Sequence, residues 1–155
     1  MLTKNEQAFL DMIAVVELGP ELLKESDDGY NIIVGSTASS PLLLLDYSDH
    51  PRVFVKKFNS TAAGRYQILQ RIYDYYKKSL GLNSFSKESQ DLIALQLIRE
   101  CKALEDINTG KISQAINKVR SRWASLPGSG YGQREHKLEY LIDIFKKNGG
   151  TVCEP

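Results

Sequence analysis

The sequence predicts an α+β fold with a mostly helical body and a small β-hairpin region. Apolar residues recur at helical spacing near both ends of the chain, whereas the middle contains short β-rich runs separated by turn residues. The 155 residues match the length of one domain, so a single domain over residues 1–155 is expected.

The first predicted helix covers Asn5–Glu17. Its apolar residues fall at i, i+3, i+4 and i+7 from Phe9 to Val16, which is typical of an amphipathic helix. Gly19 and Pro20 follow directly and end it, because glycine and proline mark helix boundaries.

The middle of the chain predicts extended structure. Tyr30–Val34 is rich in β-forming residues and stops at Gly35, and a Ser/Thr-rich loop then leads to the apolar Leu42–Leu45. Val53–Phe58 predicts a second strand region. Together these runs indicate a small β-hairpin layer inserted between helices.

Four more helices are expected after this region. Their apolar stripes run from Tyr66 to Tyr76, Leu92 to Cys101, Ile112 to Trp123 and Leu138 to Phe145. Ser60 or Thr61 can cap the first of these helices and Ser86 the second. The first is expected to end at Gly81, the third before Pro127 and the last at Gly149-Gly150.

Composition excludes several classes of protein. Twenty basic and nineteen acidic residues give a formal charge of +1, which argues against a strongly basic nucleic-acid binder. Cys101 and Cys153 are the only cysteines, so reduced thiols are expected in place of a disulfide scaffold. No apolar run approaches the roughly 20 residues that span a bilayer. The first residues carry no small-residue cleavage site, so no signal peptide is expected.

Glu17 is the most informative candidate for catalysis. It ends the first predicted helix and follows the apolar pair Val15 and Val16. The negative end of the helix dipole and apolar surroundings both disfavour ionisation, which predicts a raised pKa. A carboxylic acid that keeps its proton near neutral pH is the proton donor that glycosidic cleavage requires. The residues alone leave open a second interpretation, a solvated glutamate at a frayed helix end.

Glycoside hydrolysis usually needs a second carboxylate. Asp27, Asp28, Asp46 and Asp49 are candidates, but all four lie in segments typical of turns, beside Gly29, Ser48 or Pro51. None of them stands out as the partner of Glu17.

A metal site is not expected. His50 and His136 show no close metal-ligand spacing, and a zinc amidase would need at least three protein ligands. We expect neither a metal nor another cofactor.

Two glycine-containing segments place sugar-binding side chains beside turns. The first is Gly64 to Gln67, and the second is Gly128 to Gln133 with Tyr131 inside it. Tyrosine rings stack on sugars, and glutamine amides pair with hydroxyl and acetamido groups. Tyr66, in the first segment, is equally well explained as a core residue.

Several segments of the chain, taken in order, resemble the phage lambda endolysin family. The members of this family are phage lytic transglycosylases with a lysozyme-like fold. The resemblance runs from Ala8 to about Val152. The matching segments are AFLDMIA (8–14), GYNIIVG (29–35), DYSDHP (46–51), AGRYQ (63–67), SQD (89–91), WASLPGSGYGQ (123–133), EHK (135–137) and GGTV (149–152).

The resemblance implies a function. Glu17 matches the position of the family's catalytic acid. The implied reaction cleaves the β-1,4 bond between N-acetylmuramic acid and N-acetylglucosamine in peptidoglycan and leaves a 1,6-anhydromuramic end. Gln67 and Tyr131 resemble residues that line the substrate cleft of related enzymes, and Tyr47 and Gln133 are further substrate-binding candidates from the same motifs.

The chain departs from the family pattern around Glu17. Leu18 and Gly19 follow it where the family has glycine and threonine, and Val16 precedes it where a polar residue is expected. The segment Ser36–Leu45 looks longer than usual, and the segment after Arg52 looks shorter. In the family these segments form hairpins that close over the glycan.

The resemblance also implies partners and location. The expected partners are peptidoglycan glycan strands and a holin-type membrane protein that opens the way to the wall, with the enzyme held as a monomer in the host cytoplasm until then. A hydrolytic muramidase using Glu17 with an aspartate, a non-catalytic cell-wall binding module and a zinc amidase are the alternatives.

Overall fold

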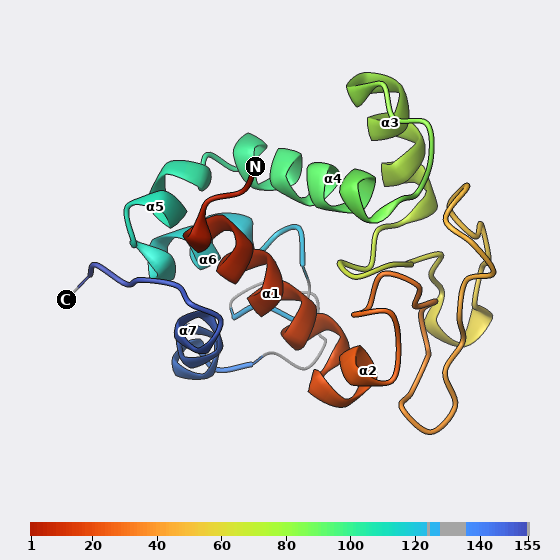
Figure 1. Cartoon of the computed structure of the whole chain (residues 1–155), viewed down its shortest axis with the longest axis horizontal. Coiled ribbons are helices and arrows are strands. Elements are labelled where there is room, and N and C mark those ends of the chain that lie inside the picture. Colours follow the sequence, from red (N-terminus) through yellow and green to blue (C-terminus); the bar gives the residue numbers. More distant parts are fainter. Residues whose placement is uncertain (124, 128–135, 155) are drawn as a thin grey trace. The chain divides into compact units, whose positions relative to one another are not determined.

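The computed structural model describes residues 1–123, 125–127 and 136–154 (Figure 1). The helices are α1 (Lys4–Leu18), α2 (Pro20–Lys24), α3 (Gln70–Leu80), α4 (Lys87–Glu100), α5 (Leu104–Asn108), α6 (Ile112–Val119) and α7 (Leu138–Lys147), with a 3₁₀ helix η1 at Lys56–Phe58. The chain forms two compact units, here called the terminal unit (Met1–Glu17 and Ala94–Pro155) and the middle unit (Leu18–Ile93). The boundary between the units falls immediately after Glu17, and the single domain expected from the length stays a prediction.

The terminal unit is helical, as its apolar spacing predicts. Phe9 of α1 and Phe145 of α7 are fully buried and meet edge to face, with ring centroids 6.5 Å apart. Helix α6 packs against both α5 and α7 and buries Ile112, Ile116 and Val119. The stripes that predict α1, α6 and α7 are therefore the core of this unit.

Helix α1 ends where the sequence predicts. Gly19 has a positive φ of 84°, a backbone conformation that favours glycine, and Pro20 begins α2 directly afterwards. Glu17 is therefore the penultimate residue of α1. The five-residue helix α2 is too short to show a periodic stripe, and it was not predicted.

The β-hairpin region of the middle unit consists of isolated bridges in the part of the chain that the structure describes. Ile32 pairs with Leu43, so the loop between these two residues folds back as a short hairpin (Figure 1, orange). Ile33 pairs with Ala63. The strand predicted at Val53–Phe58 is wrong: Val55 pairs with Ser60, and η1 turns the chain between them. Too few backbone bonds form here for regular strands.

The helix predicted from Tyr66 begins later than expected. Helix α3 starts at Gln70, and Tyr66 lies in a preceding turn in which Gly64 has a φ of 82° and Gln67 a φ of 52°. The N-cap predicted at Ser60 or Thr61 is therefore wrong, because Leu69 occupies that position. Thr61 Oγ1 still accepts a hydrogen bond of 3.0 Å from the Gln70 N–H, the first N–H of α3. Glycines that demand a positive φ interrupt a periodic pattern, which spacing alone does not reveal.

The core of the middle unit is aromatic and includes a buried amide. The rings of His50, Tyr73 and Phe85 lie with their centroids 5.1 to 5.8 Å apart. Gln90 of α4 is fully buried, donates to the carbonyls of Tyr30 and Phe85, and accepts from the Arg65 N–H. These bonds tie the start of α4 to the turns before α3.

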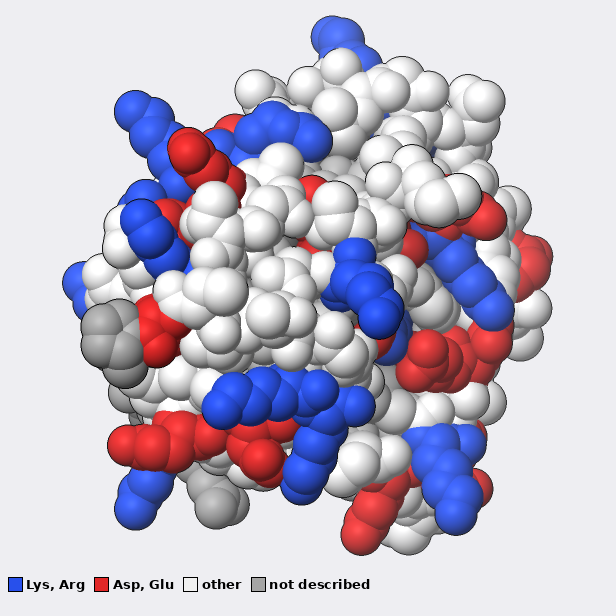
Figure 2. All heavy atoms as spheres, turned by 60° about the vertical axis from the view of Figure 1, so that its left-hand side comes forward, with Lys and Arg blue, Asp and Glu red and all other residues white. Residues whose placement is uncertain are grey.

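The surface is mixed in charge. Figure 2 shows lysine and arginine side chains interspersed with aspartate and glutamate, without a large region of one sign on the face in view. Among the described residues, no helix is both long and apolar enough to cross a membrane.

Candidate active site

Glu17 lies in the terminal unit and is half-buried. Burial disfavours its charged form and raises the pKa of the carboxyl group from 4.5 to about 7. The raised pKa predicted from the sequence is therefore found. The dominant cause in the structure is loss of solvent around the carboxyl group.

Ser125 is the residue near Glu17 that the sequence analysis missed. Its side chain interacts with the Glu17 carboxyl and lowers the pKa, which partly offsets the effect of burial. The Ser125 Oγ is itself buried and has no hydrogen bond of ordinary geometry within the described part of the chain. Its backbone is fixed, because its carbonyl accepts a 3.1 Å hydrogen bond from the His136 N–H. Ser125 lies shortly before Pro127 in the sequence, and nothing in the sequence indicates that its side chain lies near Glu17.

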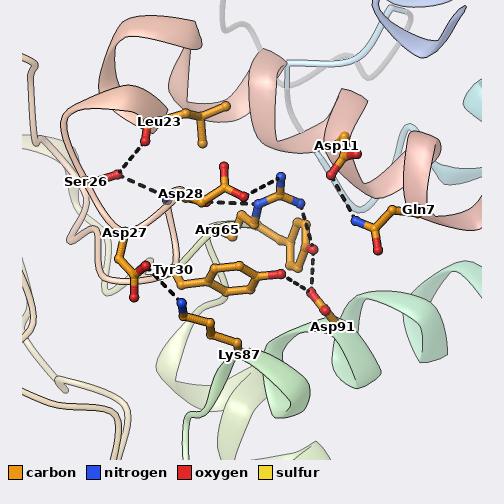
Figure 3. Close-up of polar contacts among 12 residues, drawn as sticks. Gln7, Asp11, Leu23, Ser26, Asp27, Asp28, Tyr30, Arg65, Lys87 and Asp91 are labelled. Atoms are coloured by element: carbon orange, nitrogen blue, oxygen red, sulfur yellow. Dashed lines mark hydrogen bonds and ion pairs between the residues drawn. The ribbon is translucent and has the colours of Figure 1, made fainter. Parts of the chain in front are cut away.

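Two of the four candidate aspartates lie in one turn of the middle unit and have partners there. Asp27 accepts hydrogen bonds from the Tyr47 hydroxyl (2.6 Å) and the Lys87 ammonium (2.9 Å), which lower its pKa. Asp28 is 3.4 Å from the Arg65 guanidinium. Both carboxylates are thus bound by side chains from other segments of the middle unit, and Figure 3 shows the contacts with Lys87 and Arg65.

The other two aspartates stabilise a second turn. Asp46 accepts from the hydroxyl and the N–H of Ser48, and these bonds lower its pKa. Asp49 binds Arg52 at 2.8 Å, and the same guanidinium also binds Asp74 at 2.6 Å. The turn-forming interpretation of Asp46 and Asp49 is therefore supported by their contacts.

The buried Arg65 side chain contacts the turn that contains Asp28. Only 5% of the Arg65 side chain is exposed, and its guanidinium lies over the rings of Tyr30 and Tyr66 at 5.3 and 5.6 Å from their centroids. Both tyrosine hydroxyls donate to the Asp91 carboxylate, at 2.8 and 2.5 Å. Burial and the nearby negative charge raise the pKa of Tyr30, so its hydroxyl keeps its proton. Figure 3 shows these side chains converging; the sequence gives no sign that Arg65 is buried.

The predicted substrate-binding residues are placed as follows. Gln67 is half-buried in its strained turn, and its Nε2 donates 2.9 Å to the Gly64 carbonyl. Tyr47 is half-buried and its hydroxyl is held by Asp27. Within the described residues, no hydrogen bond joins Gln67 to Tyr47. Tyr131 and Gln133 lie outside the residues that the structure describes.

His50 is a structural residue. Its Nε2 donates 2.9 Å to the Ile68 carbonyl, and its Nδ1 accepts 3.0 Å from the Arg52 N–H. Both ring nitrogens are therefore occupied and neither is free to bind a metal. Within the described ranges, no cluster of three histidine, cysteine, aspartate or glutamate side chains could hold a metal ion.

Comparison with known proteins extends over almost the whole chain. The endolysin family model matches residues 7–152. The chain is 50% identical over 158 aligned residues to the endolysin of Escherichia phage lambda, covering 99% of this chain and 96% of that protein. It is 47% identical to the endolysin of Escherichia phage P2, covering 96% of this chain and 94% of the relative.

Solved structures agree with this relationship. Bacteriophage lambda lysozyme complexed with a chitohexasaccharide has a TM-score of 0.88 and is 48% identical, with 99% of both chains covered. Another structure of lysozyme from bacteriophage lambda has a TM-score of 0.86, with the same identity and coverage. The lysozyme-like fold implied by the sequence motifs is thus confirmed, and the chain belongs to the endolysin family, phage enzymes that act on peptidoglycan.

Proposed function

We propose that this endolysin is a lytic transglycosylase that cleaves the β-1,4 bond between N-acetylmuramic acid and N-acetylglucosamine. The observation that supports this most strongly is the half-buried Glu17 with a pKa of about 7. A group with a pKa near the working pH is well suited both to give up a proton and to take one back. A transglycosylase needs both actions from one carboxyl group.

The reaction then has two steps. Protonated Glu17 donates to the glycosidic oxygen as the bond to muramic acid C1 breaks, and N-acetylglucosamine leaves with a free 4-hydroxyl. The Glu17 carboxylate next accepts the proton of the muramic acid C6 hydroxyl while its oxygen bonds to C1. The product is the 1,6-anhydro sugar, no water is consumed, and Glu17 is protonated again. The acetamido oxygen of the substrate stabilises positive charge at C1 between the steps.

The contacts of the four aspartates favour this reaction over hydrolysis. A hydrolytic muramidase needs a second carboxylate to position water or to stabilise the cation. Asp27 is bound by Tyr47 and Lys87, and Asp28 pairs with Arg65. Asp46 and Asp49 are likewise bound within their own turn. Each of these carboxylates has a structural partner in or beside a turn, so none of them is assigned here as the partner acid of Glu17.

Substrate recognition is proposed for the residues identified from the motifs. The Nε2 of Gln67 binds the Gly64 carbonyl, which leaves its Oε1 to accept from a sugar hydroxyl or acetamido N–H. The left-handed backbone of Gln67 is the kind of strain that occurs at binding sites. Tyr47 would offer its ring face, and Tyr131 and Gln133 complete the proposed set. The chitohexasaccharide bound by lambda lysozyme is a related glycan, which supports a glycan substrate here.

Mass spectrometry of digested sacculi tests the proposal. The transglycosylase yields anhydro-ended muropeptides, whereas a hydrolase yields reducing ends that are one water heavier. Glu17→Gln should reduce the rate by about 10²–10⁴-fold, since it removes the proton donor but keeps the shape. Glu21→Gln is the matched control, because Glu21 is an exposed carboxyl on the next helix. Reducing-end products alone, or full activity of Glu17→Gln, would overturn the proposal.

A further inference from the structure

A pocket lies in the middle unit at the start of α3. Its volume is about 410 Å³, within the range of roughly 300–1,000 Å³ that is typical of small-molecule sites. Polar side chains and one aromatic ring line most of it: Phe54, Asn59, Ser60, Thr61, Gln70 and Arg71. All six residues belong to the middle unit, so the pocket is formed by that unit alone.

Hydrogen-bond donors predominate in the pocket. Thr61 Oγ1 accepts the Gln70 N–H at 3.0 Å, and Ser60 Oγ accepts the N–H of Ala62 at 3.0 Å. Each hydroxyl group still has its own hydrogen to donate. The side-chain amides of Asn59 and Gln70 have no hydrogen-bond partner within the described residues, and no carboxylate lines the pocket. A ligand rich in acceptors therefore fits these groups.

Arg71 adds a positive charge to the pocket. Its side chain is exposed, and it forms no ion pair or hydrogen bond with the part of the chain that the structure describes. Asp74, the acid that follows it on α3, is bound by Arg52 at 2.6 Å. Residues 50–73 contain no acidic residue and five basic ones, namely Arg52, Lys56, Lys57, Arg65 and Arg71. This charge favours a negatively charged ligand.

The pocket lies at the base of the hairpin that carries Gln67. Ala63 and Ile68 exchange two backbone hydrogen bonds, of 3.0 and 2.7 Å, and Gln67 lies in the turn that they close. The bond between Thr61 and Gln70 joins the two arms two residues further from this turn. Gln67 and Gln70 are three residues apart, so at most about 11 Å of chain separates them. A sugar bound at Gln67 is thus close enough for a short substituent to enter the pocket.

We propose that this pocket binds a carboxylate of the peptide that muramic acid carries in peptidoglycan. The inference rests on the proposed function, in which Gln67 contacts the glycan. The lactyl group and the first two amino acids of such a peptide span about 10 Å when extended, which brings the carboxylate of the second residue, a glutamate, to Arg71.

The lining groups then have distinct roles in binding the peptide. The planar guanidinium of Arg71 binds the carboxylate through two N–H groups. The hydroxyl and amide groups of the pocket donate to the peptide carbonyls. The ring of Phe54, which is 56% exposed, covers an apolar side chain of the peptide.

A binding measurement on the full-length chain tests the recognition of the carboxylate. Both probes are N-acetylmuramyl-L-alanyl-D-glutamate with the γ-carboxyl blocked as a methylamide, and in the second probe the α-carboxyl is also an amide. In an NMR titration the acid should bind about 10-fold more tightly than the amide and should shift the backbone signals of Thr61 and Gln70. Arg71→Met should abolish this preference, and Arg71→Lys should keep part of it. Lys78→Met removes an exposed charge from the same helix outside the pocket and should keep all of it.

An activity measurement tests whether the pocket is used during cleavage. It compares kcat/KM on peptide-bearing glycan strands with kcat/KM on strands of equal length whose peptides an amidase has removed. The ratio of the two values should fall about 10-fold in Arg71→Met. Asn59→Asp should lower it as well, because it adds a repelling charge at a backbone φ of 48° that aspartate also tolerates. Asn83→Asp adds the same charge in an exposed loop outside the pocket, and its ratio should stay within about twofold.

The outcomes separate the peptide site from the proposed function. Equal binding of the two probes to the unmodified chain would overturn the peptide site. An unchanged ratio in Arg71→Met would also overturn it, including the case in which activity falls equally on both kinds of strand. Reducing-end products, or full activity of Glu17→Gln, would instead overturn the proposed function, and the binding measurement would still decide whether the pocket takes a carboxylate.

Discussion

Replacing Glu17 with glutamine should make the protein more stable at alkaline pH although it removes activity. In the folded chain the pKa of Glu17 is about 7, compared with 4.5 for an unperturbed glutamate. Between these pH values the folded state keeps a proton that the unfolded state releases, so the free energy of unfolding falls as the pH rises. The loss is complete above about pH 7 and absent well below pH 4.5.

The size of the effect follows from the shift. The difference between 4.5 and about 7, at about 1.4 kcal/mol per pKa unit, corresponds to roughly 3 kcal/mol at pH 9. Glutamine cannot ionise, so Glu17→Gln avoids this loss. The variant should match the unmodified protein at pH 4 apart from a constant offset, and should gain roughly 3 kcal/mol over it at pH 9.

Urea unfolding at pH 4, 7 and 9 measures the difference between the two proteins. Other titrating groups contribute equally to both, so they cancel in the comparison. Glu21→Gln, which removes an exposed carboxyl, should leave the pH dependence of unfolding unchanged. If the stability difference between Glu17→Gln and the unmodified protein were the same at pH 4 and pH 9, the carboxyl of Glu17 would not be desolvated, and the argument for a proton donor would be wrong.

One further prediction concerns the pH dependence of activity, and two concern stability. The rate of sacculus digestion should fall above pH 7, to about a tenth of its plateau value one unit above the pKa of Glu17. A rate that stays unchanged up to pH 9 would contradict the role of Glu17 as proton donor. Tyr66→Phe removes a hydrogen-bond donor to the half-buried carboxylate of Asp91 and should cost about 1–3 kcal/mol in thermal unfolding, whereas Tyr75→Phe, at a residue 65% exposed, should cost less than about 0.5 kcal/mol. Gly64→Ala would place a Cβ 2.3 Å from a buried glutamine oxygen and should destabilise the protein more than Gly81→Ala, which meets no atom within 4 Å; equal losses in urea unfolding would show that the turn can relax.

The helical part of the fold was predictable because its signals are local. The stripe from Phe9 to Val16 and the stop at Gly19 define α1, and Ser86 caps α4 by accepting from the Ser89 N–H. The turns before α3 were not predictable in the same way. Tyr66 fits a helical stripe, but the positive φ of Gly64 and Gln67 depends on tertiary contacts that no short segment reveals.

The candidate site, like the fold, has some residues that the sequence predicts and others that it does not. Glu17 was predicted to be the proton donor from its place at a helix end and from the family resemblance. The raised pKa that this position predicts is found, and the catalytic role stays a prediction. Ser125 and Arg65 were not identified, because their importance comes from where the fold places them. A serine or arginine of this kind looks like an ordinary surface residue until its burial is known.

Leu18 shows how a departure from a family pattern can be explained by packing. A glycine after the catalytic glutamate, as the resemblance implies for the family, would offer no side chain to hold the end of α1. Leucine at this position reaches Gly29, and the absence of a Cβ there is what makes room for it. The two residues therefore pack against each other, and the positive φ of 84° at Gly29 separately favours glycine there. Because the Gly29 turn is fixed by Arg65, the pair gives this chain a packing contact where a glycine would leave the backbone of the helix end unsupported.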